Sequence, residues 1–194
     1  MVTRTSAQSL MKQSFDRIVP DLTKKTMIKF HQDYSKTLFL GMLPKKSKVL
    51  VTNLIKSLFS IDEPLHLVLV MHLYSEVMLD AIIRKKMTNS KEILEYSYFQ
   101  KIQVLHALGT IDSTLENDLK TLNRLRNNFV HELHYDIVEF DLTKFSDMKE
   151  IYKKKNYKRK SEKRMLNLLL LKFEIMFIFA NITDQFREIL LVDG

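Results

Sequence analysis

The segment "LNRLRNNFVHEL", residues 122–133, continues an apolar stripe at helical spacing and so indicates a helix. The stripe consists of Leu115, Leu119, Leu122, Phe129 and Leu133. Arg126 occupies its middle, where another leucine would be expected, and His131 follows on a different side of the helix. The pattern predicts an amphipathic helix whose packing face carries one charged residue.

The composition favours an all-α fold for the rest of the chain. The 194 residues suit one domain with a core, or two small ones, and the 45% apolar content indicates a globular protein. Glycine and proline number three each, too few for the many tight turns of an all-β fold. Leucine, lysine, isoleucine, methionine and glutamate dominate, and this usage favours helices.

Caps and breaks in the sequence divide the chain into helices. The capping patterns are Asp62 with Pro64, Asn89 with Glu92, and Ser113 with Glu116; Gly109 ends the helix that Asn89 begins. The expected helices span residues 6–19, 21–40, 47–60, 62–86, 89–109, the motif region after residue 113, and 161–190. We therefore expect a helical bundle over residues 61–194, with an N-terminal helical extension over residues 1–60.

The absence of cysteine excludes disulfides, thiolate metal sites and cysteine nucleophiles. The N-terminal residues have no apolar segment of the kind found in signal peptides. The longest apolar run, residues 165–182, is interrupted by Lys172 and Glu174, and charges at such positions are costly in lipid. We expect this run to be a buried core helix, and the protein to be cytoplasmic with no membrane partner.

A second helix also carries polar residues on an apolar stripe. In residues 62–86, His72 and Glu76 share a stripe with Leu65, Leu69, Leu79 and Ile83. An unpaired charge on such a stripe costs several kcal/mol, so we expect Glu76 and Arg126 to face each other. The pair is either a structural ion pair that fixes helix register or a device that directs Arg126 toward an anion. The two interpretations are compatible.

Arg126, Asn127 and His131 together have the chemistry for metal-free phosphodiester cleavage. Asn127 and His131 are four residues apart and share one helix face. The planar guanidinium of arginine suits phosphate, and histidine suits proton transfer near neutral pH. The chain has no glycine-rich phosphate loop and no HExxH motif. We expect no metal and no cofactor.

These residues resemble a known family. "RNNFVH", residues 126–131, matches the Arg-Asn-x-x-x-His form of the motif of the HEPN superfamily. The preceding "YFQKIQVLHALGTIDSTLENDLKTLNRL", residues 98–125, and the earlier helix with an embedded acid, "VMHLYSEVMLDAII", residues 70–83, are similar to the HEPN layout. The resemblance covers about residues 62–190, and the first 60 residues lie outside it.

The resemblance implies a helical bundle that forms a homodimer, with two motifs meeting at the interface. Many members are metal-independent ribonucleases of toxin–antitoxin, antiphage or RNA-processing systems. Arg126 and His131 would be catalytic, Asn127 would orient His131 or the substrate, and Glu76 would belong to the site as the partner of Arg126. RNA would be the substrate, and an antitoxin or a regulatory protein would be a further partner.

A non-catalytic function is the alternative. The mannitol operon repressor family has a similar size, a similar N-terminal extension and a similar passage of apolar helix, glycine and acidic turn. Its members are regulators or interaction modules. The complete Arg-Asn-x-x-x-His pattern of this chain favours the ribonuclease.

The net charge of +8 is concentrated in "KKKNYKRKSEKR", residues 153–164, which holds eight basic residues and one acidic residue. We expect this basic run to bind the RNA backbone rather than to read its sequence, with Tyr157 as one stacking surface. The RNA-binding residues would be Lys153, Lys154, Lys155, Lys158, Arg159 and Lys160. The alternative is a solvated loop before the last helix.

Overall fold

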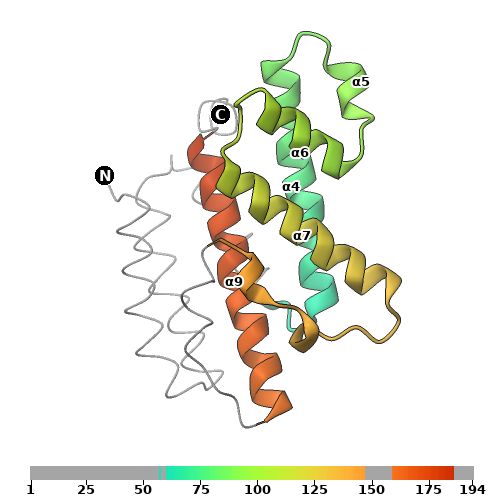
Figure 1. Cartoon of the computed structure of the whole chain (residues 1–194), viewed down its shortest axis with the longest axis vertical. Coiled ribbons are helices and arrows are strands. Elements are labelled where there is room, and N and C mark those ends of the chain that lie inside the picture. The colour runs from blue at the N-terminus through green and yellow to red at the C-terminus, as the bar shows by residue number, and fades with distance from the viewer. Residues whose placement is uncertain (1–56, 58–59, 147–158, 186–194) are drawn as a thin grey trace. The chain divides into compact units, whose positions relative to one another are not determined.

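The computed structural model describes residue 57, residues 60–146 and residues 159–185. Their regular elements are α-helices and two short 3-10 helices, with no strand among them, so the predicted all-α fold is confirmed (Figure 1). The chain divides into two compact units, Met1–Ser57 and Leu58–Gly194. The helices predicted before residue 60 and the N-terminal extension lie almost wholly outside the described residues.

The helix α4, Pro64–Lys86, begins at the predicted proline and ends in three basic residues that favour the negative end of the helix dipole. Its N-cap is Glu63, not Asp62. Its buried residues are Pro64, Leu67, Val68, Met71, Ser75, Leu79, Ile82 and Ile83. The predicted packing stripe is correct only in part: its members Leu79 and Ile83 are buried, but Leu69 is exposed, and the buried face of α4 is turned away from the rest of the stripe. His72 and Glu76 consequently lie beside the core instead of inside it.

The single helix predicted over residues 89–109 is two helices, α5, Ser90–Leu94, and α6, Tyr98–Ala107. The break has a local cause, because Ser97 and Gln100 form a capping box that starts a new helix. Gly109 ends α6 as predicted, with φ of 63°, a left-handed conformation that favours glycine. The N–H groups of Gly109 and Thr110 donate to the carbonyls of His106 and Leu105, each at 2.8 Å.

The motif helix is α7, Ser113–His131. Its N-cap is Asp112, whose carboxylate accepts from the N–H of Leu115 at 2.7 Å, in place of the predicted Ser113. Its buried residues are Leu115, Asp118, Leu119, Thr121, Leu122 and Leu125. The buried stripe thus continues through Leu125, while Phe129 and Arg126 are half-buried and Leu133 lies beyond the helix, 92% exposed.

Two 3-10 helices, η2, Ile137–Glu139, and η3, Leu142–Lys144, connect α7 toward α9, Lys160–Gln185. The predicted core helix over residues 165–182 lies within α9, and its buried residues include Leu166, Leu170, Phe173, Ile175 and Ile178. Lys172 is buried with its Nζ 3.5 Å from a carboxylate oxygen of Asp62. The helices α4, α7 and α9 contact one another pairwise, and α6 packs on α4 and α7 (Figure 1).

Among the described helices, α4 is long and apolar enough to cross a membrane by length and composition. Core helices of soluble proteins pass the same test. Here α4 carries His72, Glu76 and Asp80, which contact polar side chains of α6 and α7. These contacts are those of a helix in a protein bundle.

Candidate functional site

The motif residues Arg126 and His131 start on different sides of α7. Five residues separate them, which corresponds to about 140° around an α-helix. Arg126 is half-buried on the side of Leu119 and Leu122, and His131 is exposed as the last residue of the helix. A contact with one phosphate therefore requires the long arginine side chain to turn around the helix.

A hydrogen bond of Arg126 holds its side chain in this direction around the helix. Its Nη1 donates to Oδ1 of Asn127 at 2.9 Å. Asn127 is one turn before His131 on the same helix face, so the guanidinium is held toward the face that carries the histidine. The structure thus brings Arg126 and Asn127 together. Among the described residues, no hydrogen bond joins His131 to either of them.

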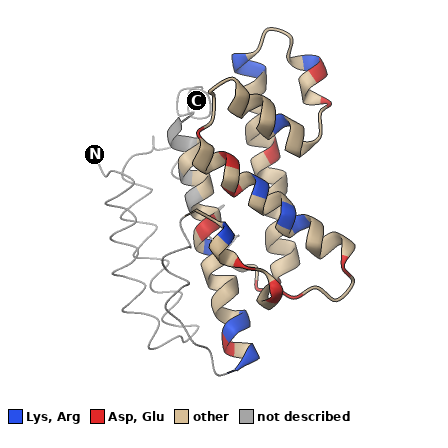
Figure 2. Ribbon diagram, viewed as in Figure 1, with Lys and Arg blue, Asp and Glu red and all other residues tan. Residues whose placement is uncertain are grey.

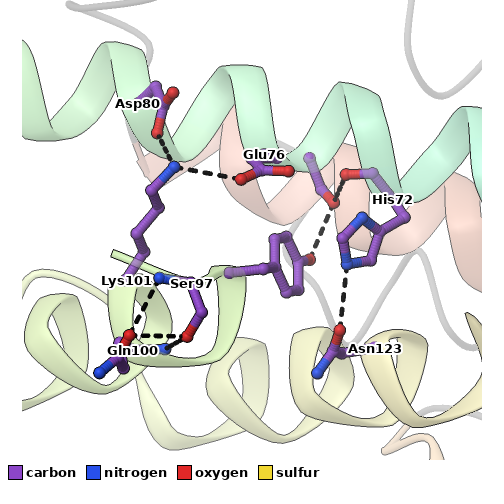
Figure 3. Close-up of polar contacts among 9 residues, drawn as sticks. His72, Glu76, Asp80, Ser97, Gln100, Lys101 and Asn123 are labelled. Atoms are coloured by element: carbon purple, nitrogen blue, oxygen red, sulfur yellow. Dashed lines mark hydrogen bonds and ion pairs between the residues drawn. The ribbon is translucent and has the colours of Figure 1, made fainter. Parts of the chain in front are cut away.

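Glu76 does not form the predicted ion pair with Arg126. Its Oε1 lies 3.1 Å from Nζ of Lys101 on α6, and the same Nζ lies 2.8 Å from Oδ1 of Asp80 (Figure 3). The prediction failed because α4 is turned, which directs Glu76 and Asp80 to α6. Glu76 thus forms an ion pair with Lys101, a residue that the sequence analysis did not single out.

Lys101 is a buried cation, 3% exposed, between two carboxylates. Burial acts to lower its pKa, but the hydrogen bonds and charges of Asp80 and Glu76 outweigh burial and raise the pKa. Lys101 therefore stays charged at neutral pH. It neutralises part of the negative charge of α4, and Glu76 pairs with it instead of with Arg126.

His72 connects α4 to the motif helix. Its Nε2 lies 3.1 Å from Oδ1 of Asn123, and its ring lies against that of Tyr98 with centroids 4.0 Å apart (Figure 3). Because an amide oxygen only accepts, Nε2 carries the proton in this arrangement. Ser75 donates to the carbonyl of His72 at 2.8 Å, and its hydroxyl lies 2.8 Å from that of buried Tyr98. These contacts fix the ring of His72.

The pKa of His72 depends on its burial and on the charges of Glu76 and Arg126. Desolvation by burial lowers its pKa, and the positive charge of Arg126 acts in the same direction. The hydrogen bond with Asn123 and the negative charge of Glu76 oppose this shift without cancelling it. His72 is therefore neutral at pH 7. The sequence placed His72 on an apolar stripe but did not identify its partner Asn123, which lies one turn before Asn127 on α7.

The described end of the basic run lies near the segment that follows His131. Lys160 and Arg164, at the start of α9, lie 3.9 Å and 3.5 Å from the carboxylate of Asp136. Figure 2 shows basic residues at the start of α9 and acidic residues in the segment that follows α7. Asp136 is five residues after His131, a span of at most about 18 Å. Arg159 is exposed and lies 4.0 Å from Glu162. The predicted RNA-binding residues Lys153, Lys154, Lys155 and Lys158 lie outside the described residues.

Exposed apolar side chains lie beside the motif. On α4, Leu69, Leu73 and Val77 form a row at a spacing of four residues, next to His72 and Glu76. On α7, Val130 is exposed one turn after Arg126. We call the three residues of α4 the apolar row. Exposed apolar side chains in a row, rather than scattered singly, mark surfaces that contact other molecules.

Comparisons with protein-family models, curated proteins and solved structures gave no match. Among the described residues, no group of three or more histidine and carboxylate side chains is arranged to hold a metal ion. Function is therefore inferred from the motif, its contacts and its surface.

Proposed function

We propose that this chain is a metal-independent endoribonuclease of HEPN type, with Arg126, Asn127 and His131 as its active group. The hydrogen bond from Arg126 to Asn127 carries this proposal, because it holds the guanidinium toward the face of His131. A phosphate bound there would meet an arginine fork and an imidazole together. The biological role would be in a toxin–antitoxin or antiphage system.

The reaction would proceed by attack of the RNA 2′-hydroxyl on the neighbouring phosphorus. The bond from O2′ to phosphorus forms as the bond from phosphorus to O5′ breaks, and the products are a 2′,3′-cyclic phosphate and a 5′-hydroxyl. His131 takes part in proton transfer, and Arg126 stabilises the charge that builds on the phosphoryl oxygens. DNA lacks the 2′-hydroxyl and would not be cut. Glu76 would act by holding Lys101, not by facing Arg126.

A homodimer is part of the proposal. The apolar row gives a surface that a second copy would cover, and it lies on α4, the helix that carries His72. In a two-fold interface the same patch contacts itself, so burial of the row would bring two motifs near each other. The arrangement thus supports a composite site.

A non-catalytic interaction module is the second candidate. The apolar row would also suit a partner protein, and His131 has no hydrogen bond to another motif residue in the part of the chain that the structure describes. The hydrogen bond between Arg126 and Asn127 would then be a local contact without a role in catalysis. Cleavage of RNA separates the two candidates.

The test uses the purified full chain, mixed RNA and a buffer with EDTA. We expect cleavage that leaves cyclic phosphate ends, and its loss in His131→Ala. His134→Ala is the matched control, because His134 is also exposed and lies three residues further on. Equal cleavage by His131→Ala and the wild type would contradict the catalytic assignment. Activity that requires added magnesium or manganese would contradict the metal-independent mechanism.

A further inference from the structure

His72 gives the motif a second imidazole within one subunit. It reaches the motif helix through Asn123, which is three residues before Arg126. His131 is five residues after Arg126. Along the axis of α7 these intervals are about 4.5 Å and 7.5 Å, so Arg126 lies between His131 and Asn123, the residue that contacts His72. Cleavage of RNA needs one group that removes a proton and one that supplies a proton, on the two sides of the phosphorus.

We propose that His72 is the general base of this site and that His131 is the general acid. This inference depends on the proposed ribonuclease function. His72 accepts the proton of the 2′-hydroxyl as O2′ attacks phosphorus, and His131 gives its proton to O5′ as that bond breaks. Each imidazole ends with the charge that the other began with, so protons and charge balance.

The contacts of His72 leave its Nδ1 atom able to accept a proton, as a general base requires. Nε2 donates to Asn123, and Nδ1 keeps its lone pair with no hydrogen-bond partner among the described residues. The charged and titratable groups around it are Glu76 on its own helix, Tyr98 on α6 and Arg126 on α7. The balance of these groups and burial keeps the ring neutral at pH 7, which is the form that accepts a proton.

The contacts of His72 would also serve a purely structural tie between α4 and α7. A structural tie affects stability, and it does not affect the dependence of the chemical step on the leaving group. The two roles therefore differ in a measurement that folding does not influence. An RNA analogue whose leaving group is a good one, such as p-nitrophenol, needs no general acid but still needs a general base.

The experiment compares His72→Gln, His131→Ala and the wild type on RNA and on uridine 3′-(p-nitrophenyl phosphate). We expect His72→Gln to lose about 100- to 10,000-fold in kcat/KM on both substrates, and His131→Ala to lose as much on RNA only. His66→Gln is the matched control, since His66 is an exposed histidine of the same helix. Recovery of His72→Gln on the p-nitrophenyl substrate, or wild-type rates on RNA, would overturn the assignment.

A second measurement covers the case in which His72→Gln does not fold. In the wild type with 15N-labelled histidine, a 2′-O-methyl oligonucleotide that cannot be cleaved should shift the Nδ1 resonance of His72. An unchanged resonance at saturating oligonucleotide would overturn the role of His72. If the wild type itself does not cleave RNA, the proposed function fails; if it cleaves and only the His72 results disagree, the base assignment alone fails.

Discussion

Nη1 of Arg126 donates to Oδ1 of Asn127 at 2.9 Å, and this bond joins two adjacent residues that start on different sides of α7. Adjacent side chains on a helix point about 100° apart, so the arginine must fold back over the helix to make it. The bond orders a flexible cation next to the face of His131. Asn127 therefore has a function that its position in the motif alone does not define: it fixes where the guanidinium is.

Asn127→Ala should lower the rate of RNA cleavage about 10- to 100-fold, since a hydrogen bond to a charged group contributes about 1.5 to 3 kcal/mol. Arg126→Ala should lose more, because the charge itself is removed. Arg124→Ala, an exposed arginine of the same helix, is the control and should retain near wild-type kcat/KM. A rate for Asn127→Ala equal to the wild type would mean that the bond does not position Arg126.

Lys101→Met should destabilise the protein by about 3 kcal/mol, because removal of one partner leaves Glu76 and Asp80 without their cation. This is near the low end for a buried pair, since both carboxylates are partly exposed. Urea unfolding at pH 7 measures the change. The triple variant Lys101→Met, Glu76→Gln, Asp80→Asn should recover much of the loss, and an equal loss in both variants would exclude the ion pair as its cause.

The same lysine predicts a loss of stability at alkaline pH. The folded pKa of Lys101 is raised above 10.5, so its contribution is complete below that value and is lost as pH rises through the folded pKa. The free energy of unfolding should therefore fall more steeply above pH 10.5 in the wild type than in Lys101→Met. Parallel curves for the two proteins would contradict the raised pKa.

The lowered pKa of His72 predicts that the free energy of unfolding falls at acidic pH. Its pKa is lowered from 6.5, so the unfolded chain binds a proton at a higher pH than the folded protein does. Stability should fall as pH decreases from about 6.5, because protonation favours the state that binds more protons. His72→Gln should lack this component, which the difference between the two unfolding curves isolates. A difference that does not change between pH 7 and pH 5 would contradict the lowered pKa.

The sequence predicted the helical class well and the packing directions less well. Caps and breaks near Pro64, Gly109 and the start of α7 are local signals, and local signals survive in the folded chain. The directions of α4 and α7 depend on neighbouring helices. Leu125, one residue before Arg126, continues the buried stripe, so the stripe that seemed interrupted by Arg126 is in fact continuous, one residue away.

The partners of the site residues were the hardest part to predict. Glu76 pairs with Lys101, 25 positions away in the sequence, and His72 pairs with Asn123, 51 positions away. The periodicity of a single sequence cannot identify such pairs, because it does not show which helices are neighbours. The motif itself, in contrast, is local, and the bond between Arg126 and Asn127 lies within it.

The protein should be a dimer at micromolar concentration, with the apolar row in its interface. His72 and His131 would supply both proton-transfer groups within one subunit, so catalysis does not itself require a second copy of the chain. The prediction of a dimer therefore depends on the exposed apolar row. Leu73→Asp should shift the protein to monomer in sedimentation velocity. Leu108→Asp is a closely matched control, because Leu108, the C-cap residue of α6, is also 62% exposed and lies outside the row. A wild-type monomer, or dissociation by both variants, would contradict an interface at the row.

The basic run should bind the RNA backbone without reading its sequence, and the salt dependence of binding tests this. Each cation that contacts a phosphate of a single strand contributes about 0.7 to the slope of log K against log salt. Replacement of six cations by glutamine should flatten that slope and weaken binding to all RNAs alike; the positions are Lys153, Lys154, Lys155, Lys158, Arg159 and Lys160. Lys85→Gln with Lys86→Gln, at the end of α4, is a control for loss of surface charge.

The position of Asp136 leads to an expected effect on KM rather than on kcat. Lys160 and Arg164 lie near Asp136, within about 18 Å of His131 along the chain, so RNA held by the run would extend toward the motif. Loss of these cations should therefore raise KM and leave kcat at saturating RNA nearly unchanged, because Arg126 and His131 are untouched. An unchanged slope would assign the run to a solvated loop and place RNA binding on another surface. A fall in kcat at saturation would instead mean that the run takes part in positioning the phosphate at the motif.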